Sequence, residues 1–195
     1  GGINHEAYLD KLVRHLDVVH WDAETGIYAD RGHNQHQFKS VEEGFAQHVG
    51  YVALFPLLLQ LIRPGDASAR LIQVMSDEAH LLSRAGLRSL SPSSPFSGGG
   101  KDTAYGTQED LWRGKVWINI NYLALQALSQ RYSSQAGAKE LYQTLRASII
   151  STLLSQWKTK GYLFEQYSDK TGAGLKSKPF TGWSALVLLI MAEQY

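Results

Sequence analysis

Apolar residues recur along much of this chain at intervals of three and four positions, which is the spacing of residues on one face of an α-helix. Leu9, Leu12, Leu16 and Val19 show this spacing near the start of the sequence. Comparable runs follow at several later positions. The pattern predicts six helices, over residues 4–20, 49–62, 67–82, 115–132, 138–157 and 184–193.

The later predicted helices alternate between two patterns of burial. Residues 115–132 are apolar nearly all round, which is typical of a helix that is buried on most sides. Residues 138–157 instead carry a single apolar stripe that runs from Leu141 to Leu153. Two concentric rings of helices would produce this alternation, with the inner ring packed on both sides, although a plain bundle could mimic it. We therefore predict an all-α fold.

Proline, glycine and serine mark where the predicted helices end. Pro56 can open a helix in its first turn or kink one, and residues 64–66 (Pro-Gly-Asp) form a turn. Gly86 fits a helix stop. Residues 89–106 are rich in Ser, Pro and Gly, and a loop of this length in a compact domain is often functional. Strands are not excluded between residues 26 and 38.

The bulk composition fits one compact domain and excludes several functional classes. The chain has 195 residues, of which 44% are hydrophobic, and this is enough for a sizeable core. A net charge of +1 gives no electrostatic reason to expect nucleic acid as a partner. The lack of cysteine excludes disulfides, thiolate catalysis and Cys-based zinc sites from this chain.

The first candidate binding segment, residues 112–122, lies where the long loop meets a predicted helix. Trp faces stack on the C–H surfaces of sugars, Arg hydrogen-bonds to vicinal hydroxyls, and Gly lets the backbone approach a ligand. Trp112, Arg113, Gly114 and Trp117 therefore have the chemistry of a sugar pocket. The alternative is that both tryptophans are core residues at the start of a helix and that Arg113 is an ion-pair partner.

The second candidate is Glu165, which has aromatic residues on both sides within residues 161–167 (Gly-Tyr-Leu-Phe-Glu-Gln-Tyr). Apolar neighbours disfavour the charged form of a carboxyl group and hydrogen-bond donors favour it, so such a setting can tune a general acid or base. The alternative is a surface turn whose aromatic residues cap the core and leave Glu165 in water.

Other motifs predict no further chemistry. Residues 169–174 lack the ligand spacing of a calcium-binding EF-hand loop, so we interpret them as a turn. His33 and His36 do not match the His-Glu-x-x-His metal signature, and no metal site is predicted. The sequence has no phosphate loop, dinucleotide fingerprint or Gly-x-Ser-x-Gly elbow.

Several short motifs occur in a definite order between about His20 and Tyr195. They are His20-Trp21 with residues 26–30, residues 50–59, 86–90, 112–114 with Trp117 and 119–125, residues 161–169, and residues 179–183. This ordered series resembles eukaryotic processing α-glucosidase I, also called mannosyl-oligosaccharide glucosidase. Chance could produce one such motif, but not the series.

The resemblance implies a fold and an activity. The fold is an (α/α)6 toroid of the six-hairpin glycosidase type with long active-site loops, and residues 1–195 supply about its last half, as the C-terminal part of the catalytic domain. Because the chain starts at Gly1 without an initiator Met, we expect a fragment of a longer protein. The implied reaction removes the terminal α-1,2-linked glucose from the triglucosylated N-glycan precursor, with inversion, in the lumen of the endoplasmic reticulum. No cofactor is implied, and the family's membrane anchor lies upstream.

The resemblance also assigns roles to individual residues. Glu165 matches the Glu that acts as general base in the family. Substrate-binding roles carry over to Trp112, Arg113, Gly114, Trp117 and Trp183. One departure is Lys115, where the family has an apolar residue or Pro.

The general acid is missing from the part of the family that this chain resembles. An inverting glycosidase needs a base that activates water and a separate acid that protonates the leaving oxygen. The family's acid is an Asp upstream of the matched region. Residues 14–17 (Arg-His-Leu-Asp) look like a family motif but occupy the wrong place in the order, so we transfer no role to them. The expected partners are therefore the upstream part of the same protein and the N-glycan of nascent glycoproteins.

Three alternatives stay open from the sequence. The enzyme could be a related toroid hydrolase with another α-glucoside substrate, because the matched motifs bind one glucose. The chain could instead be a non-catalytic glycan-binding helical module in which the tryptophans bind sugar and Glu165 only accepts a hydrogen bond. A purely structural helical domain is the third.

Overall fold

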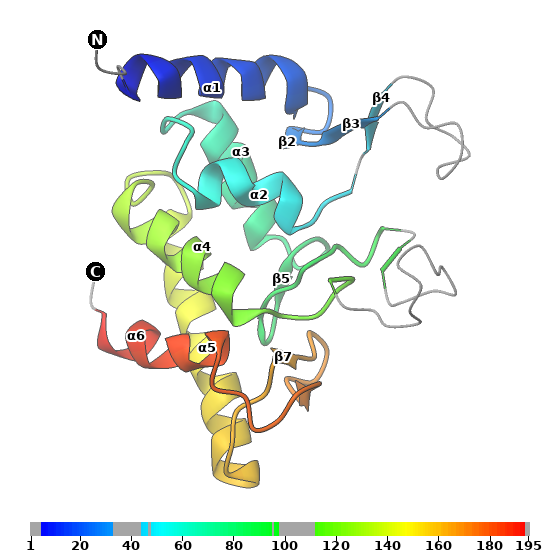
Figure 1. Ribbon diagram of the computed structural model, residues 1–195, viewed down its shortest axis with the longest axis vertical. Coiled ribbons are helices and arrows are strands. Elements are labelled where there is room, and N and C mark those ends of the chain that lie inside the picture. Colours follow the sequence, from blue (N-terminus) through cyan, green and yellow to red (C-terminus); the bar gives the residue numbers. More distant parts are fainter. Residues whose placement is uncertain (1–4, 33–43, 47, 95, 98–111, 194–195) are drawn as a thin grey trace.

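The computed structural model describes residues 5–32, 44–46, 48–94, 96–97 and 112–193, and helices form most of this fold (Figure 1). The helices of the described residues are α1 (His5–His20), α2 (Tyr51–Leu58), α3 (Asp66–Ser76), α4 (Ile118–Gln130), α5 (Ala138–Lys160) and α6 (Val187–Ala192), with a short 3₁₀ helix, η1 (Trp183–Leu186), before the last. Each overlaps a segment whose periodicity predicted a helix, so this part of the prediction is confirmed.

The helices are arranged in two layers. In Figure 1, α2, α4 and α6 lie in front of α3 and α5. Helix α4 buries residues on most of its sides between Ile118 and Leu128, whereas α5 buries one stripe that includes Leu141, Leu145 and Leu153. The predicted contrast between the two helices is therefore confirmed.

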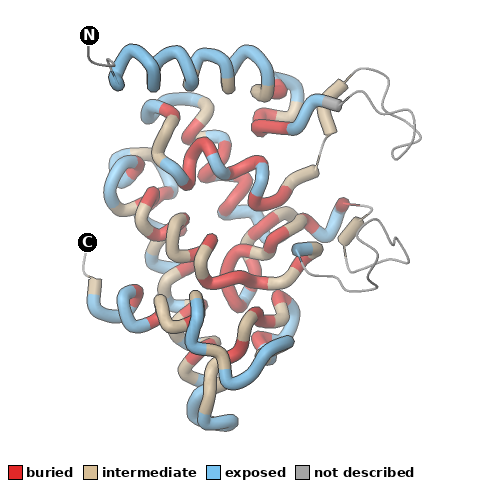
Figure 2. Tube along the Cα trace, in the orientation of Figure 1, coloured by how far each residue is buried: buried red, intermediate tan, exposed pale blue. Residues whose placement is uncertain are grey.

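The hydrophobic core lies between the layers, as the red segments of Figure 2 show. Leu54 and Leu57 of α2 are fully buried, and so are Leu71 and Met75 of α3 and Leu145 of α5. Each such side chain stabilises the folded state by about 1.5–3 kcal/mol relative to leaving it in water. The core thus holds together the helices that carry the site described below.

Helix α3 ends at Ser76, whereas the sequence predicted that this helix would continue for six more residues to Leu82. The reason is Asp77, whose backbone is extended and whose Oδ1 accepts a hydrogen bond from the Ala79 N–H at 2.8 Å. An Asp side chain that bonds to the backbone two residues on offers it a turn in place of the next helical bond. Leu82 lies in a strand, so the predicted C-terminal end of this helix was wrong.

Short antiparallel strands complete the described fold. Strand β1 (Trp21–Asp22) pairs with β2 (Ile27–Tyr28), β3 (Asp30–Gly32) with β4 (Gly44–Ala46), β5 (Leu82–Ser83) with β6 (Gly86–Leu87), and β7 (Gln166–Tyr167) with β8 (Gly174–Leu175). Strands therefore occur in the part of residues 26–38 that the structure describes, where the sequence left them open. Small sheets thus accompany the predicted helices.

Val116 connects two of these hairpins just before α4. It forms isolated bridges with Arg88 and with Tyr167, and the Val116 N–H donates to the Tyr167 carbonyl at 2.9 Å. Beside it, the Nε of Arg88 lies 3.5 Å from Oδ2 of Asp169, and both side chains are nearly buried. Asp169, which the sequence placed in a plain turn, therefore connects the β7–β8 hairpin to the residue that follows β6. These contacts hold the segment that leads into α4 against the segment that contains Glu165.

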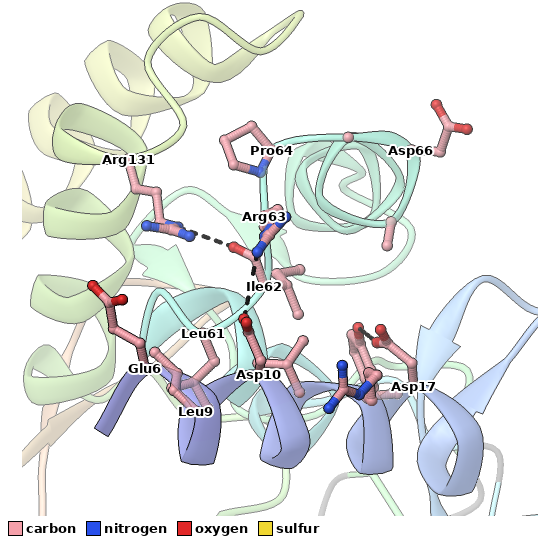
Figure 3. Close-up of a pocket in the computed structure, with 15 residues that line it drawn as sticks. Glu6, Leu9, Asp10, Asp17, Leu61, Ile62, Arg63, Pro64, Asp66 and Arg131 are labelled. Carbon is pink, nitrogen blue, oxygen red and sulfur yellow. Dashed lines mark hydrogen bonds and ion pairs between the residues drawn. The ribbon is translucent and has the colours of Figure 1, made fainter. Parts of the chain in front are cut away.

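Helix α1 differs from the other helices because none of its residues is buried. Leu9, Leu12 and Val19 of the predicted stripe keep 44%, 40% and 40% of their surface exposed, and the helix is mostly pale blue in Figure 2. An open pocket of about 800 Å³ separates α1 from the loop between α2 and α3 (Figure 3). Across it, Nη2 of Arg63 lies 3.4 Å from Oδ1 of Asp10. Within the described residues, the apolar stripe of α1 is thus incompletely covered.

Helix α5 is long enough to span a bilayer, with 23 residues, but it carries charged residues along its polar side. No helix among the described residues has both the length and the apolar character needed to cross a membrane.

Candidate active site

Trp112 and Trp117, which are close in sequence, meet the distant Trp183 in one row. The rings of Trp112 and Trp117 stack with centroids 3.7 Å apart and an angle of 11° between their planes. The ring centroid of Trp183 lies 5.6 Å from that of Trp117, and the ring centroid of Phe180 lies 4.7 Å from that of Trp183. The sequence assigned all three tryptophans to one sugar site, and the structure brings them together.

The two stacked tryptophans differ in exposure. Trp112 is 45% exposed, whereas Trp117 is only 3% exposed. Trp117 therefore has the burial of a core residue, as the alternative interpretation of this segment stated, while Trp112 leaves part of its aromatic surface exposed. An exposed indole face can stack on the C–H surface of a sugar ring.

A buried polar network fixes the backbone of Trp117. The Trp117 N–H donates to the hydroxyl of Tyr51 at 3.2 Å, and the same hydroxyl donates to the carbonyl of Leu87 at 2.6 Å. Burial raises the pKa of Tyr51, which keeps its phenol protonated and able to donate. Asn121 joins the network, because its Nδ2 donates to the Trp117 carbonyl at 2.8 Å and its Oδ1 accepts from the Leu87 N–H at 2.7 Å. The stacked pair is thus held from α2, α4 and β6 together.

Gly114 and Arg113 lie between the two stacked tryptophans in sequence. Gly114 is buried, its N–H donates to Oγ of Ser89 at 2.9 Å, and its φ of +124° is a conformation that side chains rarely adopt. Glycine is therefore required at this position by the backbone itself. Arg113, which follows Trp112 in the chain, is partly exposed.

Glu165 lies directly before β7 and is partly buried. Its Oε2 accepts hydrogen bonds from Oγ of Ser177 at 2.7 Å and from the Ser177 N–H at 3.2 Å. Its backbone carbonyl accepts a hydrogen bond from Nε1 of Trp183 at 2.6 Å. Two donors of Ser177 thus contact the partly exposed carboxylate, and the Glu165 backbone is bonded to Trp183 of the tryptophan row.

The aromatic neighbours of Glu165 anchor its backbone in the core. Phe164 and Tyr167 are 5% and 0% exposed, and the Phe164 N–H donates to the Tyr167 hydroxyl at 3.2 Å. Ser184 Oγ donates to the Phe164 carbonyl. Burial raises the pKa of Tyr167, so its phenol stays protonated. The backbone on either side of Glu165 is therefore fixed by buried rings.

These residues together offer an aromatic surface, a guanidinium and an ordered carboxylate. A model of the family described as the glycosyl hydrolase family 63 C-terminal domain matches residues 3–193 of the chain. The chain belongs to this family.

Named relatives agree with membership in family 63. The chain is 36% identical to a probable mannosyl-oligosaccharide glucosidase of Schizosaccharomyces pombe over 96% of its length, and 33% identical to the mannosyl-oligosaccharide glucosidase of Saccharomyces cerevisiae over 94%. It spans only 22% of the length of each of these relatives. The resemblance found in the sequence is therefore confirmed.

A solved structure of family 63 is also similar. The mannosylglycerate hydrolase of Thermus thermophilus, in complex with Tris and D-glycerate, superposes with a TM-score of 0.67 at 25% identity. The match covers 96% of this chain and 38% of that protein. The described helices and small sheets thus have the arrangement of part of a larger family 63 fold.

Sequence reasoning missed the hydrogen-bonding roles of three residues that contact the candidate site residues. Tyr51, Asn121 and Ser177 act through contacts with residues 12 to 70 positions away in the chain. No local pattern marks such contacts. Asn121 alone gave a sign, because it is a polar residue within the nearly continuous apolar run of residues 115–132.

The motifs to which the sequence gave no catalytic or metal-binding role can be compared with the structure in part. Asp17 accepts a hydrogen bond at 2.6 Å from the hydroxyl of Tyr28, whose pKa is raised by burial and then by this bond. The pair His33 and His36 lies outside the described residues. In the described residues, no three His, Cys, Asp or Glu side chains are grouped so that they could hold a metal ion.

Replacing Gly174 by alanine should disturb this site through Phe164. A Cβ built on Gly174 would lie 2.0 Å from Cδ2 of the Phe164 ring, which is buried next to Glu165. Because overpacking a core costs about 1–3 kcal/mol, the melting temperature of the complete protein should fall by several degrees and its activity with it. Gly65→Ala is the control, since no atom lies within 4 Å of its added methyl group. Equal effects of the two substitutions would show that the contact with Phe164 is unimportant.

Proposed function

We propose that this chain is the C-terminal part of the catalytic domain of an inverting exo-α-glucosidase. The enzyme removes the terminal α-1,2-linked glucose from the triglucosylated N-glycan precursor during glycoprotein processing. The observation that carries the proposal is an ordered Glu165 bonded to the tryptophan row, in a chain 33–36% identical to mannosyl-oligosaccharide glucosidases. A glycan-binding module without catalysis would bind the glycan without releasing glucose, and the assay described below distinguishes the two.

In this mechanism Glu165 is the general base. It takes a proton from a water molecule, whose oxygen attacks the anomeric carbon on the face opposite the leaving group. A separate acid, supplied by the upstream part of the protein, protonates the glycosidic oxygen as the bond to the anomeric carbon breaks. The products are β-glucose and the shortened glycan, and no cofactor takes part.

Substrate binding falls to the residues around the tryptophan row. The exposed ring of Trp112 stacks on the terminal glucose, and Arg113 donates hydrogen bonds to its hydroxyls. The buried Trp117 supports Trp112 from behind, Gly114 permits the close approach of the backbone, and Trp183 links this surface to Glu165.

The complete fold in this proposal is an (α/α)6 toroid, of which this chain forms about the last half. The two layers of helices support it, as the inner and outer rings of such a toroid. Apolar side chains in the front layer also support it, because Val52 of α2 is 57% exposed, Leu59 directly after α2 is 53% exposed, and Leu188 of α6 is 67% exposed. Burying them against the upstream half would remove this apolar surface from water.

A buried amide also favours completion of the site by another segment. Gln166 is 0% exposed, and neither its Oε1 nor its Nε2 has a hydrogen-bond partner among the described residues. Buried polar side chains nearly always have a partner, so water or the upstream part of the protein fills this role.

The proposed partners of the chain are the upstream part of the same protein and the N-glycan of nascent glycoproteins. The proposed place of action is the lumen of the endoplasmic reticulum.

The test is hydrolysis by the complete protein of three substrates: the triglucosylated N-glycan, an α-1,2-linked glucose disaccharide and mannosylglycerate. We expect glucose release from the first at the highest kcat/KM, and proton NMR of the first minutes should show β-glucose before mutarotation. Preference for mannosylglycerate would assign the activity of the Thermus thermophilus relative instead. Initial formation of α-glucose would contradict the inverting mechanism.

A further inference from the structure

We propose that Ser177 is a positioning residue that holds the carboxylate of Glu165 in the orientation needed for base catalysis. The inference rests on the proposed function, because it concerns the same reaction. Three hydrogen bonds join the two residues. Besides the two donors to Oε2 at 2.7 and 3.2 Å, the Glu165 N–H donates to the Ser177 carbonyl at 3.1 Å.

The donors of Ser177 contact only one of the two carboxylate oxygens of Glu165. Both donors of Ser177 reach Oε2, and among the described residues no other donor contacts the carboxylate. Two bonds from one residue to one oxygen fix the rotation of the group, and Oε1 remains for the water molecule. A base that is held in place loses less catalytic power to misaligned orientations than one that rotates freely.

The backbone around Ser177 is arranged to present these donors. Lys176 has a φ of +63°, a left-handed conformation that costs a residue with a side chain on the order of 1 kcal/mol. Such a backbone persists when its surroundings impose it, and it is found preferentially at functional sites. This left-handed residue directly precedes Ser177, whose N–H and hydroxyl both donate to Glu165.

Both ends of this short segment are anchored. On one side Leu175 pairs with Gln166 in the β7–β8 hairpin, and on the other the Phe180 N–H donates to the Leu163 carbonyl at 2.9 Å. The backbone on both sides of Ser177 is therefore anchored by hydrogen bonds, although the side chain of Ser177 is exposed. An anchored donor loses little conformational entropy when it binds the carboxylate, which makes the contact effective in spite of the exposure.

The experiment compares four variants of the complete enzyme on the triglucosylated glycan: Ser177→Ala, Ser177→Thr, Glu165→Gln and the double variant Ser177→Ala with Glu165→Gln. We expect Ser177→Ala to lower kcat about tenfold with KM changed less than about twofold, since the backbone donor remains. Ser177→Thr, which keeps a hydroxyl, should recover kcat to within about threefold. In the double variant the loss should equal that of Glu165→Gln alone, because Ser177 acts through Glu165.

The control is Ser151→Ala on the exposed side of α5, which should leave kcat unchanged. A kcat of Ser177→Ala within twofold of the wild type, while Glu165→Gln is inactive, would overturn the role of Ser177 and leave the proposed function intact. An active Glu165→Gln variant would instead overturn the assignment of Glu165 as the base in the proposed mechanism, and with it the role of Ser177. A loss in Ser177→Ala that Thr does not restore, or that adds to the loss of Glu165→Gln, would show a structural role and also overturn the inference.

Discussion

Replacing Glu165 by glutamine in the complete enzyme should lower kcat for release of the terminal glucose by about 100-fold or more, the usual contribution of general base catalysis. Glutamine has nearly the same size and can still accept the hydrogen bonds of Ser177 through its amide oxygen. It cannot take a proton from water. The substitution therefore removes the chemistry of the base and leaves the surrounding geometry in place.

Two measurements separate this loss of chemistry from a loss of structure. The melting temperature of Glu165→Gln should stay close to that of the wild type, and KM for the glycan should change little, because the tryptophan row is intact. Glu140→Gln is the matched control, since Glu140 lies exposed in the first turn of α5. A Glu165→Gln enzyme that retained a kcat within about tenfold of the wild type would show that another group is the base.

The helices could be predicted from the sequence because their apolar residues are close to one another in the chain. The stripe from Leu141 to Leu153 and the nearly all-round apolar run of residues 115–132 each determine how one helix is buried. The end of α3 could not be predicted in this way, because the side chain of Asp77 competes with the next turn of the helix. The burial of α1 was also beyond the local pattern, since it depends on which other segments cover the helix.

The candidate site could likewise be predicted only in part from the sequence. Glu165, Trp112 and Trp117 could be proposed from residue chemistry and from the resemblance of short motifs. Their mutual geometry depends on hydrogen bonds between distant segments, such as the bond from Trp183 Nε1 to the Glu165 carbonyl. Ser177 gave no sign in the sequence, because a serine in a polar segment is common and only the fold places it against a carboxylate.

Asn121 supports the site from the core, and Asn121→Ala should destabilise the protein by about 3–5 kcal/mol. The side chain is 0% exposed, and besides its bonds to Trp117 and Leu87 its Nδ2 donates to the Tyr51 hydroxyl at 3.1 Å. Alanine would leave the buried Leu87 N–H without its side-chain acceptor, and the Trp117 carbonyl would keep only the bond from the backbone N–H of residue 121. A cavity would add to the cost, because Asn121 packs so closely on Gly86 that a Cβ there would lie 2.7 Å from its Oδ1.

The melting temperature of the complete protein should therefore fall by several degrees in Asn121→Ala, and hydrogen exchange at the Leu87 amide should become faster. Asn121→Leu separates the two causes, because leucine fills most of the volume but restores no hydrogen bond, so most of the loss should remain. Ser129→Ala is the control on the same helix, as its hydroxyl makes only a local bond to the Gln126 carbonyl. Because Asn121 fixes the backbone of Trp117, KM for the glycan should also rise in the destabilised variants. An Asn121→Leu protein with wild-type melting temperature and wild-type KM would show that volume, rather than the polar network, holds the stacked tryptophans in place.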